Sequence, residues 1–298
     1  MTDATFSITA ERARRLARDR GTLEAVVEAM IRPGNWGARV AYAFGLQGRL
    51  RTSTLSVDFS TTKAASRCPS QPLRIAFASD FHAGGLTDDR MLEQACAALA
   101  TLNPDILLLG GDFVAVRAED VRRITPLLEA IPAPLGKLAV LGNHDLRAGS
   151  GKIISALEHA GIRLITNQHV TVRAQFGSVS ISGLDDTTRG WPRGDLALDE
   201  ANADRRVVLM HSPEGLESIG DRHFDLALCG HTHGGQISLP WGTPIFMPGG
   251  PLNRQYSRGN HTLVGDRPRM LLVSRGVGCS SFPVRLFAAP EVHLCLIT

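Results

Sequence analysis

Five short segments of the chain carry side chains that could hold metal ions. They combine aspartate, asparagine and histidine with glycine: Asp80-Phe-His82, Gly110-Gly-Asp112, Gly142-Asn-His-Asp145, His211, and Gly230-His-Thr-His-Gly-Gly235. A mixed set of nitrogen and oxygen donors without thiolates suits Mn²⁺, Fe or Zn²⁺ better than Ca²⁺ or Mg²⁺. The set is large enough for two divalent ions, of which we expect Mn²⁺ first, with Fe or Zn²⁺ as alternatives.

The spacing within the segments favours convergence of the side chains. On an extended backbone, residues two apart point to the same side, which we expect for Asp80 and His82. His231 and His233 have the same spacing between glycines, which give the backbone freedom to turn. Taken alone, an Asp-x-His pair or a histidine after a strand is common in proteins without metal. The inference depends on the whole set.

The third segment adds groups suited to proton transfer. Asn143 offers a neutral carbonyl oxygen to a metal, and His144 is a candidate proton donor. Asp145 is a candidate to fix the tautomer of His144 and to raise its basicity. Two ions about 3.5–4 Å apart can clamp the attacking and leaving oxygens of an in-line displacement at phosphorus. The residues therefore indicate metal-assisted phosphoryl chemistry.

Every one of these polar segments follows an apolar stretch that is typical of a buried strand. We expect strands over 73–78, 105–109, 137–141, 162–165, 206–210 and 225–228, with helices over 88–102, 119–131 and 152–160. Strands that alternate with helices predict an α/β fold with parallel strands, which bind ligands beyond their carboxyl ends. After residue 170 the helices become sparse, apart from one over 213–219. Further strands over 179–182, 270–273 and 292–297 then predict a second sheet.

Residues 1–54 differ from the rest and are predicted to form a helical N-terminal extension before a catalytic domain at 55–298. The stretch 10–31 has an amphipathic helical pattern, and 36–46 carries aromatic residues flanked by arginines. Such a segment could lie on an anionic membrane surface, although packing against the protein itself is favoured. The polar stretch 60–72 is predicted to be a linker.

Composition excludes several classes of protein. The chain has 298 residues, and its net charge of +3 gives no strong case for nucleic-acid binding. Five scattered cysteines argue against a disulfide framework. There is no secretory leader pattern, and the longest apolar stretch is too short to span a bilayer. We expect a cytoplasmic protein, with peripheral contact at the inner membrane as the alternative. The sequence does not indicate the oligomeric state.

The five segments, in this order between residues 80 and 233, resemble the motifs of calcineurin-like metallophosphoesterases. The likeness is closest to the bacterial YkuE/YaeI-like branch, through residues 183–186, 230–240, 273–278 and 285–291. The resemblance implies a four-layer α/β/β/α sandwich of two mixed sheets. It also implies one metal held by Asp80, His82, Asp112 and His233, and another held by Asp112, Asn143, His211 and His231. A metal-bridging hydroxide would attack phosphorus in line, while His144 assists the leaving group.

The resemblance leaves the substrate open. A phosphodiesterase is the first expectation, and a pyrophosphatase acting on a lipid-linked or nucleotide-sugar substrate of the UDP-diacylglucosamine type is the alternative. A non-catalytic scaffold is disfavoured because all seven ligand residues and His144 are present. A nuclease is disfavoured by the modest charge. Arg189, Arg254 and Tyr256 follow turns that could border the site, and are candidates for contact with the phosphate ester.

Overall fold

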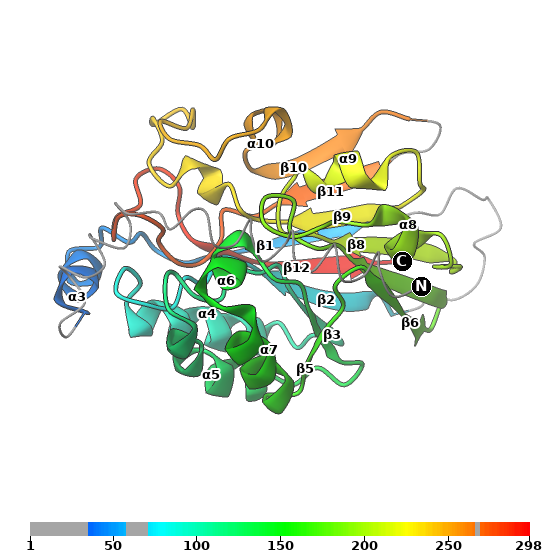
Figure 1. Ribbon diagram of the computed structural model, residues 1–298, viewed down its shortest axis with the longest axis horizontal. Coiled ribbons are helices and arrows are strands. Elements are labelled where there is room, and N and C mark those ends of the chain that lie inside the picture. Colours follow the sequence, from blue (N-terminus) through cyan, green and yellow to red (C-terminus); the bar gives the residue numbers. More distant parts are fainter. Residues whose placement is uncertain (1–34, 58–70, 266–268) are drawn as a thin grey trace, which may run out of the picture.

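Two six-stranded β-sheets pack face to face, with helices on their outer faces (Figure 1). This computed structural model describes residues 35–57, 71–265 and 269–298. The first sheet has the order β1-β12-β2-β3-β4-β5, and its strands are Arg51–Val57, Glu291–Ile297, Leu73–Ala78, Ile106–Leu109, Lys137–Ala139 and Ile162–Leu164. The second has the order β10-β11-β9-β8-β7-β6, with strands Gly259–Leu263, Arg269–Val273, Leu226–Cys229, Arg205–Leu209, Gly177–Gly183 and Gln168–Ala174.

The apolar residues of β2 show how the layers form. Leu73, Ile75 and Phe77 point into the core between the two sheets, while Ala76 and Ala78 face the helices. Because strand side chains alternate, one buried strand serves both interfaces. The core between the sheets also takes side chains from β7, β8 and β9.

Helices cover both outer faces of the sandwich. On the first sheet lie α4 (Asp89–Thr101), α5 (Thr125–Glu129) and α7 (Ser150–His159), while α8 (Gly194–Leu198) and α9 (Gly215–Ile219) cover the second. Three short elements lie near the strand ends, α6 (Asn143–Ala148), η3 (His233–Gly235) and α10 (Pro251–Gln255). The expected four-layer α/β/β/α sandwich of two mixed sheets is confirmed.

Two predicted elements differ from the structure. The helix expected over 119–131 is divided into a 3₁₀ helix, η2 (Ala118–Arg123), and α5, with Pro126 in the first turn of α5. Proline lacks the N–H that a continuous helix would need at this position, so it starts a new helix instead. The strand at the C-terminus, β12, belongs to the first sheet rather than the second, where it lies between β1 and β2.

The N-terminal part of the chain is described from residue 35 onward, as α3 (Trp36–Ala43) and β1. The helix expected over 10–31 and most of the linker expected over 60–72 lie outside the described residues. β1 pairs with β12 from Arg51 to Val57, so the expected boundary after residue 54 falls inside a strand of the first sheet. Among the described residues, no helix has the length and apolarity needed to cross a membrane.

Candidate metal centre

All seven candidate ligands follow the carboxyl ends of parallel strands from the two sheets. In the first sheet, β2, β3 and β4 are adjacent and parallel; in the second, β8 and β9 are. β2 leads to Asp80 and His82, β3 to Asp112, and β4 to Asn143. In the second sheet, β8 leads to His211, and β9 leads to His231 and His233. Because the two sheets are stacked, the ends of the five strands meet at one edge of the sandwich.

Five of these ligands adopt an unusual backbone conformation. Asp80, His82, Asp112, His231 and His233 have φ between 43° and 70°, in the left-handed region that non-glycine residues rarely adopt. Asp80 and His82 therefore do not converge through strand alternation, as the sequence suggested. They lie beyond β2, where the chain turns sharply. Backbone strain of this kind is concentrated at functional sites, because the surrounding structure must compensate for it.

Glycines let the segments approach each other closely. A Cβ atom on Gly142 would lie 2.1 Å from Oδ1 of Asp112, and one on Gly230 would lie 2.1 Å from Oδ2 of Asp80. Any side chain at either position would displace the carboxylate beside it. This contact explains why glycine precedes the polar residues of both segments.

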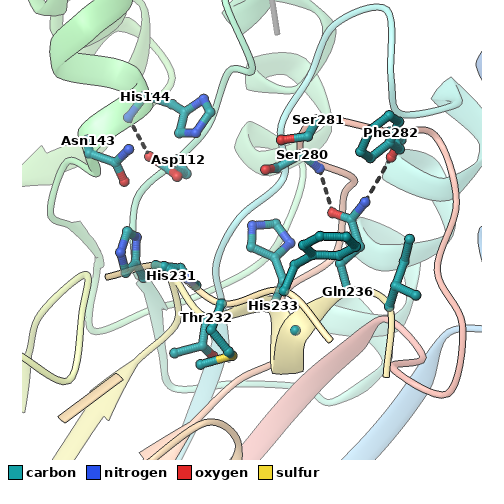
Figure 2. A pocket seen from close by; sticks show the side chains of 15 residues that line it. Asp112, Asn143, His144, His231, Thr232, His233, Gln236, Ser280, Ser281 and Phe282 are labelled. Carbon is teal, nitrogen blue, oxygen red and sulfur yellow. Dashed lines mark hydrogen bonds between the residues drawn. The ribbon is translucent and has the colours of Figure 1, made fainter. Parts of the chain in front are cut away.

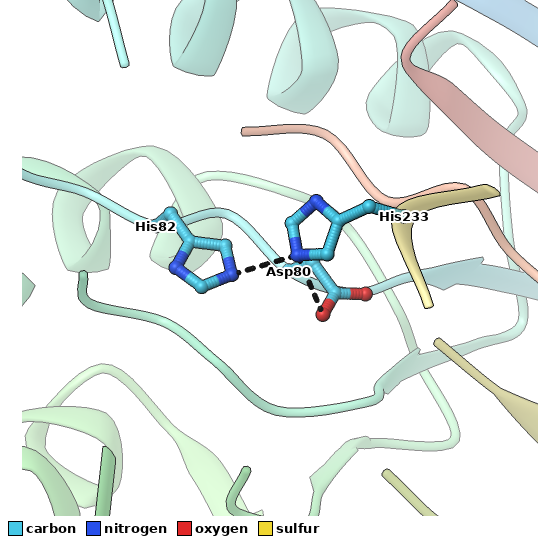
Figure 3. A group of neighbouring side chains, drawn as sticks. All are labelled: Asp80, His82 and His233. Atoms are coloured by element: carbon cyan, nitrogen blue, oxygen red, sulfur yellow. Dashed lines mark hydrogen bonds and ion pairs between the residues drawn. The ribbon is translucent and has the colours of Figure 1, made fainter. Parts of the chain in front are cut away.

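Asp80, His82 and His233 form the first group of candidate ligands (Figure 3). Nε2 of His82 lies 3.0 Å from Nε2 of His233, which in turn lies 3.5 Å from Oδ1 of Asp80. The Asp80 carboxylate accepts hydrogen bonds from the Ser79 hydroxyl and the His231 backbone N–H. These bonds hold the carboxylate in position beside the two rings.

Asp112, His211 and His231 form a second group, with Asn143 beside them, and a third group of His82, Asp112 and His144 overlaps both. Nε2 of His211 lies 3.3 Å from Oδ2 of Asp112, 3.1 Å from Oδ1 of Asn143 and 3.1 Å from Nδ1 of His231. The same Asp112 oxygen lies 3.4 Å from Nε2 of His82 in the first group. Asp112 therefore occupies the position between the two groups that a bridging ligand requires.

The chemistry of these atoms fits divalent cations. Carboxylate and amide oxygens are acceptors, and Nδ1 of His211 faces the Gly110 carbonyl at 2.8 Å, so Nε2 is the nitrogen of that ring that can bind a metal once its proton is displaced. Several acceptors therefore point toward one another within a buried cluster, where they would repel in the absence of a cation or proton. A histidine that donates one ring N–H to a carbonyl and presents the other nitrogen is the usual arrangement of a metal ligand.

The protonation of these groups supports the same interpretation. Burial lowers the pKa of His82 and His233, and lowers that of His231 to about 3, so these rings are neutral at neutral pH. Burial raises the pKa of Asp80 to about 6. Burial also acts to raise the pKa of Asp112, but nearby histidines, His211 first, hold it well below its ordinary value. His211 differs from the other rings: although burial acts to lower it, the charge of Asp112 raises the pKa of His211 well above its ordinary value, so this ring is protonated when no metal is bound. A metal that binds there must replace this proton, whereas the other three imidazoles and the central carboxylate are already in the form that binds metal.

The side chains of His144 and Asp145 have different hydrogen-bond partners, so the expectation that Asp145 fixes the tautomer of His144 is wrong. Nδ1 of His144 lies 2.6 Å from the Ala115 carbonyl and 2.8 Å from Nη2 of Arg147. The Asp145 carboxylate instead accepts the backbone N–H groups of Gly142 and Val114. Adjacent residues on a helix point in different directions, and both lie in α6, so Asp145 does not orient the ring of His144. Burial, together with the charge of Asp112, raises the pKa of Asp145 to about 8.

A cavity of about 350 Å³ opens onto the candidate ligands (Figure 2). Asp112, Asn143, His144, His231 and His233 line it, and residues of two loops complete the lining, among them Gln236, Ile237, Phe246, Met247, Ser280 and Phe282. Gln236 joins these loops, because its side chain donates to the carbonyl of Phe282 and accepts the N–H of Ser280. The sequence placed Gln236 in a motif but assigned it no role.

The three candidate substrate contacts are not brought to this cavity. The part of the cavity lining formed by the described residues does not include Arg189, Arg254 or Tyr256. Tyr256 lines a second cavity and packs against the ring of His261. Arg285, which the sequence did not single out for this role, is buried beside the centre, with Nη2 3.1 Å from Nδ1 of His233. The sequence contains many arginines, and no local pattern distinguishes Arg285 from the others as a residue of the centre.

Comparison with known proteins agrees with this geometry. The sequence profile described as Calcineurin-like phosphoesterase matches residues 73–235. The chain is 33% identical to the uncharacterized metallophosphoesterase YkuE of Bacillus subtilis, over 72% of this chain and 75% of YkuE. It is also 33% identical to phosphodiesterase YaeI of Escherichia coli, over 75% of this chain and 81% of YaeI. UDP-2,3-diacylglucosamine pyrophosphatase LpxG of Chlamydia trachomatis is 28% identical, over 74% and 82% of the two chains. The chain belongs to the calcineurin-like phosphoesterase family and is a phosphoric ester hydrolase.

Proposed function

We propose that this protein is a dinuclear metal-dependent phosphohydrolase whose preferred substrate is a phosphodiester. The observation that carries the proposal is the convergence of two groups of buried acceptors on one carboxylate, Asp112, at the wall of an open cavity. His144 lies in the same wall. A similarity to the phosphodiesterase YaeI supports the choice of substrate class.

The candidate ligands divide into two sets that share Asp112. One ion would be held by Asp80, His82, Asp112 and His233, and the other by Asp112, Asn143, His211 and His231. When bound, the two divalent ions supply Lewis acidity, which neutralises charge on the phosphoryl oxygens and lowers the pKa of water. The protein contributes the fixed positions of the ligands, through the bonds that hold Asp80 and His211.

His144 is placed to handle a proton at the cavity. The contact of its Nδ1 with the Ala115 carbonyl fixes the ring and leaves the opposite edge, with Nε2, as the one that can meet a substrate. As an imidazolium, His144 would donate Nδ1–H to that carbonyl and Nε2–H to the leaving oxygen of the ester. The backbone N–H of His144 also donates to Oδ1 of Asp112, which ties the proton donor to the shared ligand.

Metal removal tests the proposal directly. Purified protein treated with a chelator should lose hydrolysis of bis(4-nitrophenyl) phosphate, and addition of Mn²⁺ should restore it. Parallel additions of Fe²⁺ and Zn²⁺ rank the metals, and elemental analysis of the restored enzyme should give two ions per chain. Full activity in protein shown to be free of metal would contradict the proposal.

A second candidate function is hydrolysis of a pyrophosphate that carries a lipid. The cavity lining also includes Ile237, Phe246, Met247 and Phe282, which suit a hydrocarbon chain better than a nucleotide. The similarity to LpxG, named as a UDP-2,3-diacylglucosamine pyrophosphatase, supports the same class. A panel of phosphomonoesters, phosphodiesters and acylated pyrophosphates, compared by kcat/KM, distinguishes the two functions.

A further inference from the structure

The exposed aromatic side chains of the described residues are confined to three segments. These are 36–46, 241–246 and 282–287, which we call the apolar rim. All six exposed Phe and Trp residues lie there, namely Trp36, Phe44, Trp241, Phe246, Phe282 and Phe287. Exposed aliphatic side chains of the rim are Val40, Leu46, Ile245 and Leu286. A clustered patch of this kind marks an interaction site, whereas isolated exposed apolar residues are ordinary.

The three segments lie side by side at one end of the molecule. Leu286 exchanges backbone hydrogen bonds with Gln236 and Ser238, and the N–H of Ile245 donates to the carbonyl of Ile237 between them, which joins the second and third segments. The N–H of Arg285 donates to the carbonyl of Leu46, which joins the first segment to the third. Figure 1 shows α3 and these loops together at the left end of the sandwich. The rim is therefore one surface, built from parts far apart in the sequence.

This surface borders the cavity of the candidate metal centre. Phe246 and Phe282 belong both to the rim and to the cavity wall, where they face the side that carries His231 and His233. Trp241, by contrast, lies at the tip of a turn closed by the bond from Gly242 N–H to the Leu239 carbonyl. Trp241 is 75% exposed.

The charge of the rim has one sign. The stretches 35–51, 226–265 and 276–290 contain no aspartate or glutamate, although the chain has 29 such residues. Arg39 and Arg49, next to the exposed residues of α3, are themselves exposed. The neighbouring helix α4 brings both signs of charge close to α3, since Arg90 stacks on Tyr42 and is paired with Asp88, and Glu93 is exposed near them. Within the rim itself, large apolar side chains bordered by exposed arginines match the interfacial region of an anionic membrane.

We propose that the apolar rim docks on the surface of an anionic lipid bilayer, so that the mouth of the cavity faces the lipid headgroups. The aromatic side chains would enter the interfacial layer while the arginines contact anionic headgroups. A second copy of this chain fits less well, because a symmetric contact would bring the arginines of both copies together. The docking itself does not depend on the proposed hydrolysis.

Vesicle binding of the full chain tests the docking. Wild-type protein should co-sediment with vesicles of phosphatidylglycerol and phosphatidylcholine, and much less with phosphatidylcholine alone. The variant Phe44→Ser/Trp241→Ser/Phe287→Asn should bind the anionic vesicles at least about tenfold more weakly. Asparagine is chosen at residue 287 because that residue has a φ of 55°, which asparagine tolerates. Arg39→Gln/Arg49→Gln should also weaken binding about tenfold, and should reduce its dependence on salt.

A matched variant controls for the loss of exposed apolar surface elsewhere. Leu196 and Val264 are 56% and 96% exposed and lie outside the rim, so Leu196→Ser/Val264→Ser should bind vesicles as the wild type does. Thermal unfolding of each variant in the absence of vesicles confirms that it is folded. The measurement needs no substrate, so an inactive protein that binds vesicles contradicts the proposed function alone.

Two outcomes would overturn the docking proposal. One is equal vesicle binding by the wild type and the rim variant, which would assign any membrane affinity to another part of the chain. The other is absence of vesicle binding together with self-association in sedimentation velocity that the rim variant abolishes. That result would assign the surface to contact between copies.

Discussion

Buried histidines occur in two polar clusters of the described residues, one around His293 and one at the candidate metal centre. The hydrogen-bond partners of the histidines differ between the two. His293, on β12, has Nδ1 at 2.6 Å from the Ser53 hydroxyl and Nε2 at 3.1 Å from the Ser274 hydroxyl. Glu291 lies 3.4 Å from the same ring and is bound by Arg275 through both its backbone N–H and its guanidinium. Each polar atom of this cluster faces a group that can complete a hydrogen bond. The cluster is a closed network.

The candidate metal centre is arranged in the opposite way. Around His211 and His82, ring nitrogens and carboxylate oxygens converge, and the raised pKa of His211 supplies a proton to only part of this set. Burial alone therefore does not distinguish a structural histidine from a ligand, since both types are buried here. The distinction lies in the partners: hydroxyl groups can adapt as donor or acceptor, whereas a set of acceptors requires a cation. The predictions below test this distinction.

The largest effect is expected from Asp112→Asn, which keeps the shape of the side chain and removes its charge. Since Asp112 is the shared candidate ligand, the bound metal should fall below two ions per chain. Phosphodiester hydrolysis should fall by more than about 10³-fold. Glu291→Gln, which removes a buried charge from the closed network, is the control and should keep both ions. Two ions in Asp112→Asn by elemental analysis would contradict the assignment.

His144→Ala should separate proton transfer from metal binding. The residue lies in the cavity wall but belongs to neither proposed ligand set, so the metal content should remain that of the wild type. Turnover should fall by about 10²–10⁴-fold, which is the usual contribution of a general acid. A nitrophenyl leaving group needs less help from an acid, so the loss should be greater with an alkyl ester. Loss of metal from this variant would assign His144 to the ligands.

Histidine substitutions in the two clusters should differ in their effects on stability. In metal-free protein, His293→Asn should lower the free energy of unfolding by about 2 kcal/mol or more, because it breaks a buried network. His82→Asn should change it by less than about 1 kcal/mol, because it removes one of several opposed acceptors. Addition of Mn²⁺ should raise the Tm of His293→Asn more than that of His82→Asn, which has lost one ligand of the first set and keeps the second set complete. An equal rise in Tm with Mn²⁺ in both variants would contradict the assignment of His82 as a metal ligand.

A pH dependence of stability, confined to acid pH, is expected from the closed network. Although burial acts to raise it, bonds from His293 and Arg275 lower the pKa of Glu291 from 4.5 to about 2. A carboxyl with a lowered pKa in the folded state stabilises the protein above pH 4.5, and this stabilisation is lost as the pH falls toward 2. The contribution is about 2–3 kcal/mol. Urea unfolding of Glu291→Gln between pH 5 and 2 should show a shallower loss than the wild type; equal slopes would contradict the prediction.

Local pattern predicted the strands that lead into the centre because each is short, apolar and buried on both faces. The stretch Leu73–Ala78 coincides with β2, and the edge strand β6, whose residues are partly exposed, gave no comparable pattern. The sheet to which β12 belongs could not be predicted, since pairing with β1 and β2 depends on contacts between distant parts of the chain. The division of the helix at Pro126 could have been anticipated from the proline alone.

The sequence by itself determined the chemical content of the centre, namely which donors exist, in what order, and which strands carry them. It also determined the family, because the spacing of these residues is specific. Only the tertiary structure decided where the side chains point. Asp145 supports the backbone rather than His144, Tyr256 belongs to another cavity, and three separate segments form one apolar rim. Side-chain direction and surface contiguity depend on backbone turns and on packing between sheets, and neither is encoded in a local pattern.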